Sequence, residues 1–206
     1  PFPDGDPTAQ QHSLRVLSAV VDTGLDHDTA STLVHRVLPD VVEALAGDSD
    51  DIASEASELL SAVAEEDPEA LVPAAADIVA GLTSESSQLY TRRTLERLLA
   101  QEPAAFDTLI PECRRLLDAD STAHSTKESV TGLLSNAAEQ SPSRLSGLTG
   151  VLEAALDQGD DVSYNACVAL KEISKEHPDA IVEHAPALLD VVDDQNARGR
   201  FIAANT

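Results

Sequence analysis

The chain has 206 residues and a formal net charge of −24, with 37 acidic and 13 basic side chains. Hydrophobic residues make up 42% of it and aromatic residues only 2%. This length and apolar content suffice for one domain with a sizeable core and are typical of a globular chain rather than a disordered one. The negative charge also makes a nucleic-acid partner unlikely, because it would repel the phosphate backbone.

Residues 1–28 are expected to form an N-terminal segment with one capping helix, from about Pro7 to Thr23. After that segment, residues that open a helix recur every 35 to 39 positions. They are Ser31, Pro68, Pro103, Pro142 and Pro178. Proline at the first helical position after a polar cap is a typical helix start. A fixed period of this length indicates a repeat protein, with repeats in residues 29–206 starting near 29, 67, 102, 141 and 177.

The first helix of each repeat is predicted to be amphipathic and kinked. About eight residues into this helix the sequence has Pro39, Pro111, Pro186 or, in the fourth repeat, Gly150. The second repeat differs, because Ala76 takes this place and Pro73 comes early. An interior proline removes a backbone hydrogen bond and bends a helix, so a bend is expected at one phase of the repeat.

An acidic turn ends each first helix, and a second amphipathic helix follows. Its apolar residues at helical spacing are, in one repeat, Ile52, Ala56, Leu59, Leu60 and Val63, and in another Val162, Ala166, Ala169, Leu170 and Ile173. One helix pair cannot bury its apolar face alone, whereas stacked pairs share a core. We therefore expect an all-α solenoid. A closed helical bundle is the alternative, but it gives no reason for a kink at a fixed period.

Three stretches resemble the HEAT-repeat family: PDVVEALAGDSDDIASEASELLSAV, PECRRLLDADSTAHSTKESVTGLL and PALLDVVDDQNARGRF. They share the family's kinking proline, spaced leucines, Asp-rich turn and apolar second helix, and Arg198 lies near the usual place of the family's arginine. The resemblance covers about Thr29 to Thr206. It implies a right-handed α-α superhelix, a HEAT-like solenoid of about five helix pairs.

A repeat of this kind encodes stacking and no chemistry. The resemblance implies a non-enzymatic scaffold for protein–protein interaction, whose partner is another protein that docks on the concave face lined by the second helices. The alternative is a metal- or cofactor-dependent enzyme on a HEAT-like frame. Deoxyhypusine hydroxylase is such an enzyme and binds iron through His-Glu pairs.

The sequence does not meet that metal-ligand pattern. His177 and His184 each follow a glutamate, so the order is Glu-His, and it occurs only there. We expect His177 to cap a helix and His184 to be a solvated helix residue, with no catalytic residue, metal or cofactor. Cys113 and Cys167 are predicted to be buried free thiols, which fit a reducing cytoplasm.

One set of residues is left for binding. On the helices around 90–97 and 164–175, the side that faces away from the apolar stripe has Tyr90, Arg93, Arg97, Tyr164, Lys171 and Lys175. Tyrosine and arginine are favoured residues at protein interfaces, so we expect this set to bind a partner of acidic or mixed charge. The other interpretation is an ordinary solvated face, on which Arg92 and Arg93 pair with Glu96.

The acid-coated, lysine-poor composition resembles proteins of salt-accumulating halophiles, particularly haloarchaea. Concentrated salt screens the mutual repulsion of the acids. No signal segment or apolar stretch long enough for a membrane is seen, so a cytoplasmic protein is expected.

The chain stops within a second helix, which would leave Phe201 and Ile202 on an end surface. We therefore expect a fragment or end-to-end self-association.

Overall fold

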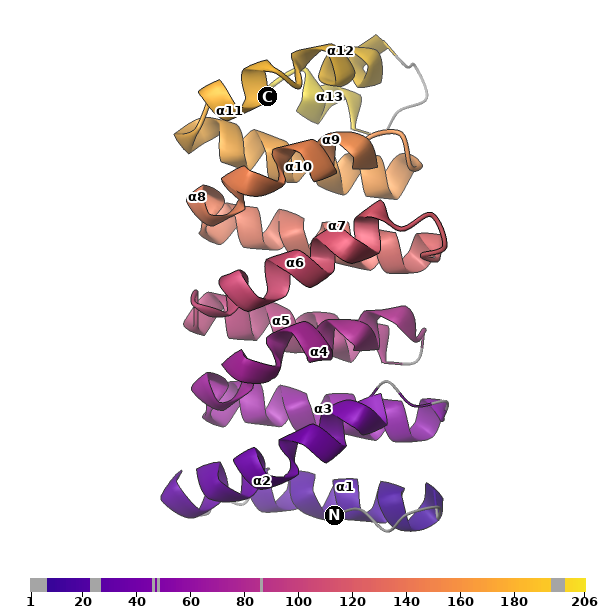
Figure 1. The fold of residues 1–206 in the computed structure, drawn as a ribbon, viewed down its shortest axis with the longest axis vertical. Helices are drawn as coiled ribbons and strands as arrows, with labels where there is room; N and C mark the ends of the chain where they lie inside the picture. The colour runs from indigo at the N-terminus through magenta and orange to yellow at the C-terminus, as the bar shows by residue number, and fades with distance from the viewer. Residues whose placement is uncertain (1–6, 23–26, 46, 48, 86, 194–198) are drawn as a thin grey trace. The chain divides into compact units, whose positions relative to one another are not determined.

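The computed structural model describes residues 7–22, 27–45, 47, 49–85, 87–193 and 199–206. Over these residues it contains helices and turns and no strand (Figure 1). Arg198, the side chain of Phe201 and part of the N-terminal segment lie outside this range. The chain divides into two compact units, Pro1–Glu112 and Cys113–Thr206, and the boundary falls within one helix.

Unit 1, residues 1–112, contains two layers of helices. Its elements are α1 (Pro7–Asp22), α2 (His27–Leu45), α3 (Asp50–Glu66), the 3₁₀ turn η1 (Pro68–Ala74), α4 (Ala75–Val79), η2 (Ala80–Thr83), α5 (Gln88–Gln101) and the first part of α6 (Ala105–Asp118). The second helix α3 packs between α1 and α5, so α1 occupies the place of a second helix (Figure 1). The first helices, α2 and the η1–α4–η2 segment, cover this layer.

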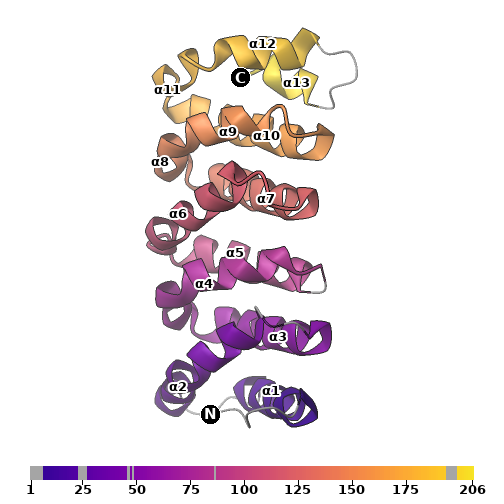
Figure 2. The same ribbon diagram turned by 45° about the vertical axis from the view of Figure 1, so that its right-hand side comes forward.

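Unit 2, residues 113–206, repeats this arrangement. After the end of α6 it contains α7 (His124–Gln140), α8 (Pro142–Leu145), η3 (Ser146–Leu148), α9 (Thr149–Ala155), α10 (Asp160–Glu176), α11 (Asp179–Val182), α12 (Ala185–Asp193) and α13 (Arg200–Ala203). The helix α10 packs against α7 on one side and α13 on the other (Figure 2). The segments α8–α9 and α11 lie over α10.

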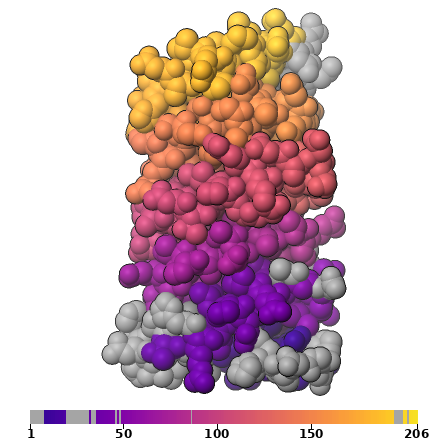
Figure 3. Space-filling model, in the orientation of Figure 1, coloured from indigo at the N-terminus to yellow at the C-terminus, as the bar shows by residue number. Residues whose placement is uncertain are grey.

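The core of each unit is aliphatic. The second helices contribute Leu60 and Leu98 in unit 1 and Leu170 and Ile173 in unit 2, all at most 1% exposed. Among the described side chains, Phe106 of α6 is the one large aromatic residue that is fully buried. Within each unit the surface is banded in chain order, because each helix pair packs on the pairs next to it in sequence (Figure 3). This is the nearest-neighbour packing that stacked repeats produce.

The first helices bend in two ways. The helices α2 and α6 continue through Pro39 and Pro111, whose rings are exposed. The later first helices are interrupted instead: by the 3₁₀ turn η3 just before Gly150, and between α11 and α12 just before Pro186. In the second repeat, the early Pro73 lies in the 3₁₀ turn η1. Proline lacks the backbone donor of a regular helix, and a 3₁₀ turn tightens the chain at η1 and η3.

Helix starts differ in detail from the sequence prediction. Asp67 and Ser141 stand at the N-cap position before Pro68 and Pro142, but neither side chain makes a capping hydrogen bond. His177 is the C-cap of α10, and its backbone N–H donates to the carbonyl of Ile173.

No helix in the described part of the chain is long and apolar enough to span a membrane.

Candidate functional site

The outward side of α5 in unit 1 carries three of the predicted binding residues. The opposite side of this helix is buried at Thr91, Leu95 and Leu98, each at most 1% exposed. A helix buried on that stripe turns residues 90, 93 and 97 outward. Tyr90 is half-buried, and Arg93 and Arg97 are exposed. We call this set the α5 triad.

Arg97 of the α5 triad is engaged with the neighbouring helix. Its Nη1 donates to Oγ of Ser61 at 3.1 Å and forms an ion pair with Glu65, and both partners lie on α3. On the other side of α3, Arg15 of α1 donates to Glu55 at 2.6 Å. The hydrogen bond and charge of Glu55 raise the pKa of Arg15. Carboxylates of α3 are therefore paired with one arginine from each of the two helices beside it.

Arg93 is the cation of the α5 triad that stays available. Arg92 pairs with Glu96 one turn along the helix, at 3.4 Å, as the solvated-face interpretation expects. Arg93 is exposed and has no ion pair among the described residues. One turn before it, Leu89 is 49% exposed and adds apolar area to the same side. Leu89 was not among the predicted binding residues, because an apolar residue within a helix is first assigned to the core.

In unit 2, α10 carries the other three predicted residues, the α10 triad of Tyr164, Lys171 and Lys175. The opposite side of α10 is fully buried at Val162, Ala166 and Ile173. Tyr164 and Lys171 are half-buried and Lys175 is exposed. Lys175 pairs with Glu172 one turn earlier, whereas Lys171 has no ion pair within the described segments. Each triad is thus gathered on one helix side, and the two triads belong to different units.

The histidine prediction is wrong for His184. This side chain is only 5% exposed, and its Nδ1 lies 2.8 Å from Oε2 of Glu153. Glu153 belongs to α9, so the pair joins two consecutive first helices of unit 2. The contact could not be seen in the sequence because its partners are 31 residues apart.

Replacing His184 with alanine is expected to lower the free energy of unfolding by about 2 kcal/mol, since it removes a partly buried hydrogen bond and leaves a void. The measurement is urea denaturation at constant high salt. The matched control is His12→Ala, because His12 is exposed on α1 and its loss should change stability by less than about 0.5 kcal/mol. Equal effects of the two substitutions would show that the His184–Glu153 contact does not stabilise the fold.

Metal-ligand clusters and cysteine reactivity bear on the enzyme alternative. No three His, Cys, Asp or Glu side chains are grouped as metal ligands in the part of the chain that the structure describes. Cys113 and Cys167 are buried, and neither is in a disulfide. Burial raises the pKa of Cys167 to about 11, and the hydrogen bond with Ser163 only partly opposes this. A thiol with such a pKa is a poor nucleophile near neutral pH.

Comparisons with known proteins show the fold. No family model and no curated protein sequence matches the chain. An engineered protein solved by a structural genomics consortium is 19% identical with a TM-score of 0.60, and the match covers 99% of this chain and 91% of that one. A designed armadillo repeat protein, solved in complex with the peptide (KR)4, is 18% identical with a TM-score of 0.61, covering 99% and 94%.

This is an armadillo-like α-solenoid fold. The match confirms the all-α superhelix of stacked helix units that the repeat pattern predicts. An armadillo-like solenoid presents long helical surfaces and has no fixed catalytic centre, so its function depends on the residues exposed on those surfaces. The α5 and α10 triads remain predictions for such a surface.

Proposed function

We propose that this chain is a non-enzymatic scaffold that binds another protein through the outward sides of its second helices. The observation that carries the proposal is the α5 triad, where half-buried Tyr90 lies beside exposed Arg93 on an otherwise acidic molecule. A tyrosine provides contact area at low entropic cost, and a free guanidinium can meet a carboxylate of the partner. The designed armadillo protein, which binds a peptide, supports protein binding by this fold.

The α10 triad supports the same proposal in unit 2. Tyr164 and Lys171 repeat the combination of a half-buried tyrosine and a cation without an ion pair among the described residues. Arg97 and Lys175 are already paired with glutamates, so they contribute less to a partner. We therefore expect a partner of acidic or mixed charge, held by the tyrosines first and by Arg93 and Lys171 second.

The experiment begins with a pull-down from a native high-salt lysate, which identifies the partner. Tyr90→Ala and Tyr164→Ala should then each weaken its binding by about 1–2 kcal/mol, the range of a moderate hot spot. Arg93→Ala should matter less in high salt than in low salt, because screening weakens the charge contribution. Calorimetry measures each affinity.

The matched control is Val182→Ala, which truncates an apolar side chain that is 70% exposed on the first helix α11. This variant should bind like the parent. If both tyrosine variants bind like the parent while Val182→Ala abolishes binding, the partner uses the first helices. Metal analysis tests the enzyme alternative: stoichiometric iron or zinc held through His177 or His184 would overturn the proposal.

A further inference from the structure

An open groove lies on the opposite layer of unit 1, between α2 and the η1–α4–η2 segment. Its volume is about 570 Å³. The residues that line it are Leu38, Pro39, Val42, Glu43, Ala70, Pro73, Ala74, Asp77 and Ala80. On α2 they form two adjacent rows at a spacing of four, and on the facing segment they recur every three or four residues. The groove therefore lies between the facing sides of two consecutive first helices, α2 and the η1–α4–η2 segment.

Small and rigid residues account for the open space. Leu38, Ala70 and Ala74 are at most 9% exposed and form the floor. The facing segment contributes mainly alanines and Pro73, whose short side chains fill little of the space beside α2. A proline on each side also bends its helix. The groove is of the size that holds a side chain and its neighbours, since binding pockets span about 300–1,000 Å³.

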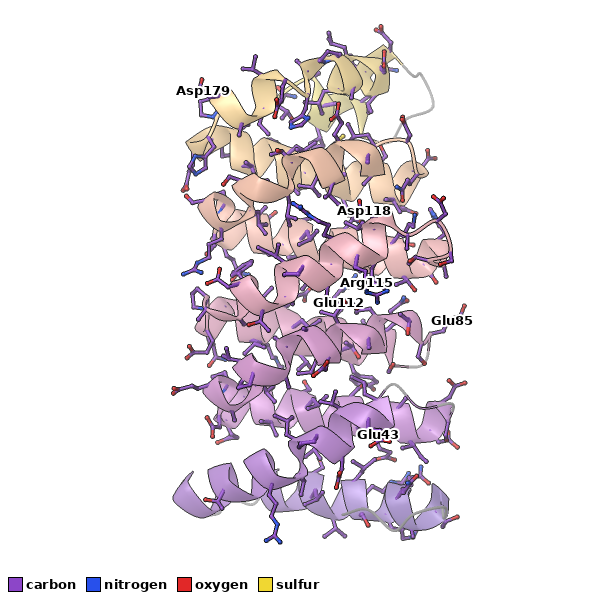
Figure 4. All side chains as sticks on the ribbon, in the orientation of Figure 1. Glu43, Glu85, Glu112, Arg115, Asp118 and Asp179 are labelled. Atoms are coloured by element: carbon purple, nitrogen blue, oxygen red, sulfur yellow. The ribbon has the colours of Figure 1, made fainter. Side chains whose placement is uncertain are left out.

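Two carboxylates stand at the edge of this apolar floor. Glu43, labelled in Figure 4 near the end of α2, and Asp77 of α4 are both exposed. Neither side chain has a hydrogen bond or ion pair with another described residue. The ion pairs on the second helices of this unit, by contrast, use Glu55, Glu65 and Glu96. The groove thus combines an apolar floor with uncompensated negative charge.

We infer that this groove binds an arginine or lysine side chain presented by a protein partner beside an apolar residue. The methylene stem of such a side chain would lie on Leu38, Val42 and Ala74, and its cation would reach Glu43 and Asp77. Long basic side chains bind in this way, with an apolar stem and a charged head. The net charge of −24 would steer a basic segment toward the molecule and repel a second copy of this chain.

This site lies on the first helices and goes beyond the proposed second-helix face, so the two can be tested separately. The probe is the peptide acetyl-Leu-Arg-Leu-amide, titrated into the isotope-labelled full chain at the lowest salt that preserves the melting temperature. Amide signals of Leu38, Val42 and Ala74 should shift. The same peptide with citrulline in place of arginine keeps the shape without the charge, and it should bind about tenfold more weakly, as expected for losing two exposed charge contacts.

Variants of the chain provide the matched test. Glu43→Gln with Asp77→Asn should weaken the arginine peptide about tenfold. The control, Glu69→Gln with Glu85→Gln, changes net charge equally at exposed positions outside the groove, and Glu85 points away from the ribbon in Figure 4. It should change affinity less than about twofold, because neither glutamate lines the groove and exposed charges are screened. Ala74→Leu, which fills the groove without changing charge, should also remove the shifts.

The inference is overturned if the citrulline peptide binds as well as the arginine peptide, or if the control pair weakens binding as much as the groove pair. It is also overturned if the peptide shifts α5 amides and Tyr90→Ala removes its binding. That last result would place the peptide on the second-helix face and leave the proposed function standing. If no partner binds the second helices while the groove responds as described, only the proposed function fails.

Discussion

Transfer from about 2 M to about 0.05 M salt should lower the melting temperature by about 10 °C or more, because the screening length grows several-fold and several kcal/mol of stability are lost. With 37 acidic and 13 basic side chains, most carboxylates cannot have a basic partner. The described ion pairs, such as Arg15–Glu55 and Arg97–Glu65, also lie on the surface, where they add little. Mutual repulsion of the acids therefore dominates in dilute salt.

Thermal melts followed by circular dichroism measure this effect. Sucrose at the osmolality of the 2 M sample is the control. Sucrose is excluded from the protein surface, as stabilising salts are, but it does not screen charge. It should recover only a small part of the loss. A melting temperature that does not change with salt would contradict the interpretation of the acidic surface as a halophilic adaptation.

Gly81→Ala should destabilise unit 1 by about 3 kcal/mol, the cost of forcing an extra carbon into a packed core. A Cβ on this buried glycine would lie 2.6 Å from Oγ1 of Thr91 and 2.7 Å from Cδ2 of Leu45. Those atoms belong to α5 and α2, and the Thr91 hydroxyl is also 3.3 Å from Oγ of Ser57 on α3. No neighbour can withdraw without disturbing a helix contact. The melting temperature should fall by about 6–12 °C.

Gly150→Ala is the matched control for this substitution. Gly150 lies in α9, and a Cβ there would meet nothing within 4 Å. Alanine is the better helix former, so this variant should be neutral or more stable by up to about 1 kcal/mol. Equal destabilisation by the two substitutions would show that close packing at Gly81 does not matter. Both are measured by denaturation at the same salt concentration.

The second helices were the most predictable part of this fold. Their apolar residues follow a period of 3.6, and Ala56 and Ile173, chosen on that basis, are fully buried. The outward position of Arg93 follows from the same geometry. The first helices were harder, because proline bends α2 and α6 without ending them, whereas the equivalent helix near Gly150 is interrupted by a 3₁₀ turn.

Contacts between helices could not be predicted from one sequence. The ion pair of Arg97 with Glu65 and the partly buried pair of His184 with Glu153 join residues about one repeat apart, and their side-chain directions depend on packing. The groove between α2 and the η1–α4–η2 segment could not be predicted from the sequence either. Ala70, Ala74 and Ala80 are ordinary helix formers in the sequence, and only their position opposite Val42 and Pro39 leaves space.

The central claim is that a partner docks on the outward sides of the second helices. The most direct measurement is a cross-saturation experiment on the isotope-labelled chain in complex with the protein captured from the lysate. The account predicts that saturation of the partner reduces signals around Leu89, Tyr90 and Arg93 of α5 and around Tyr164 and Lys171 of α10. Signal loss confined to α2, α4, α9 and α12, with α5 and α10 unaffected, would contradict it.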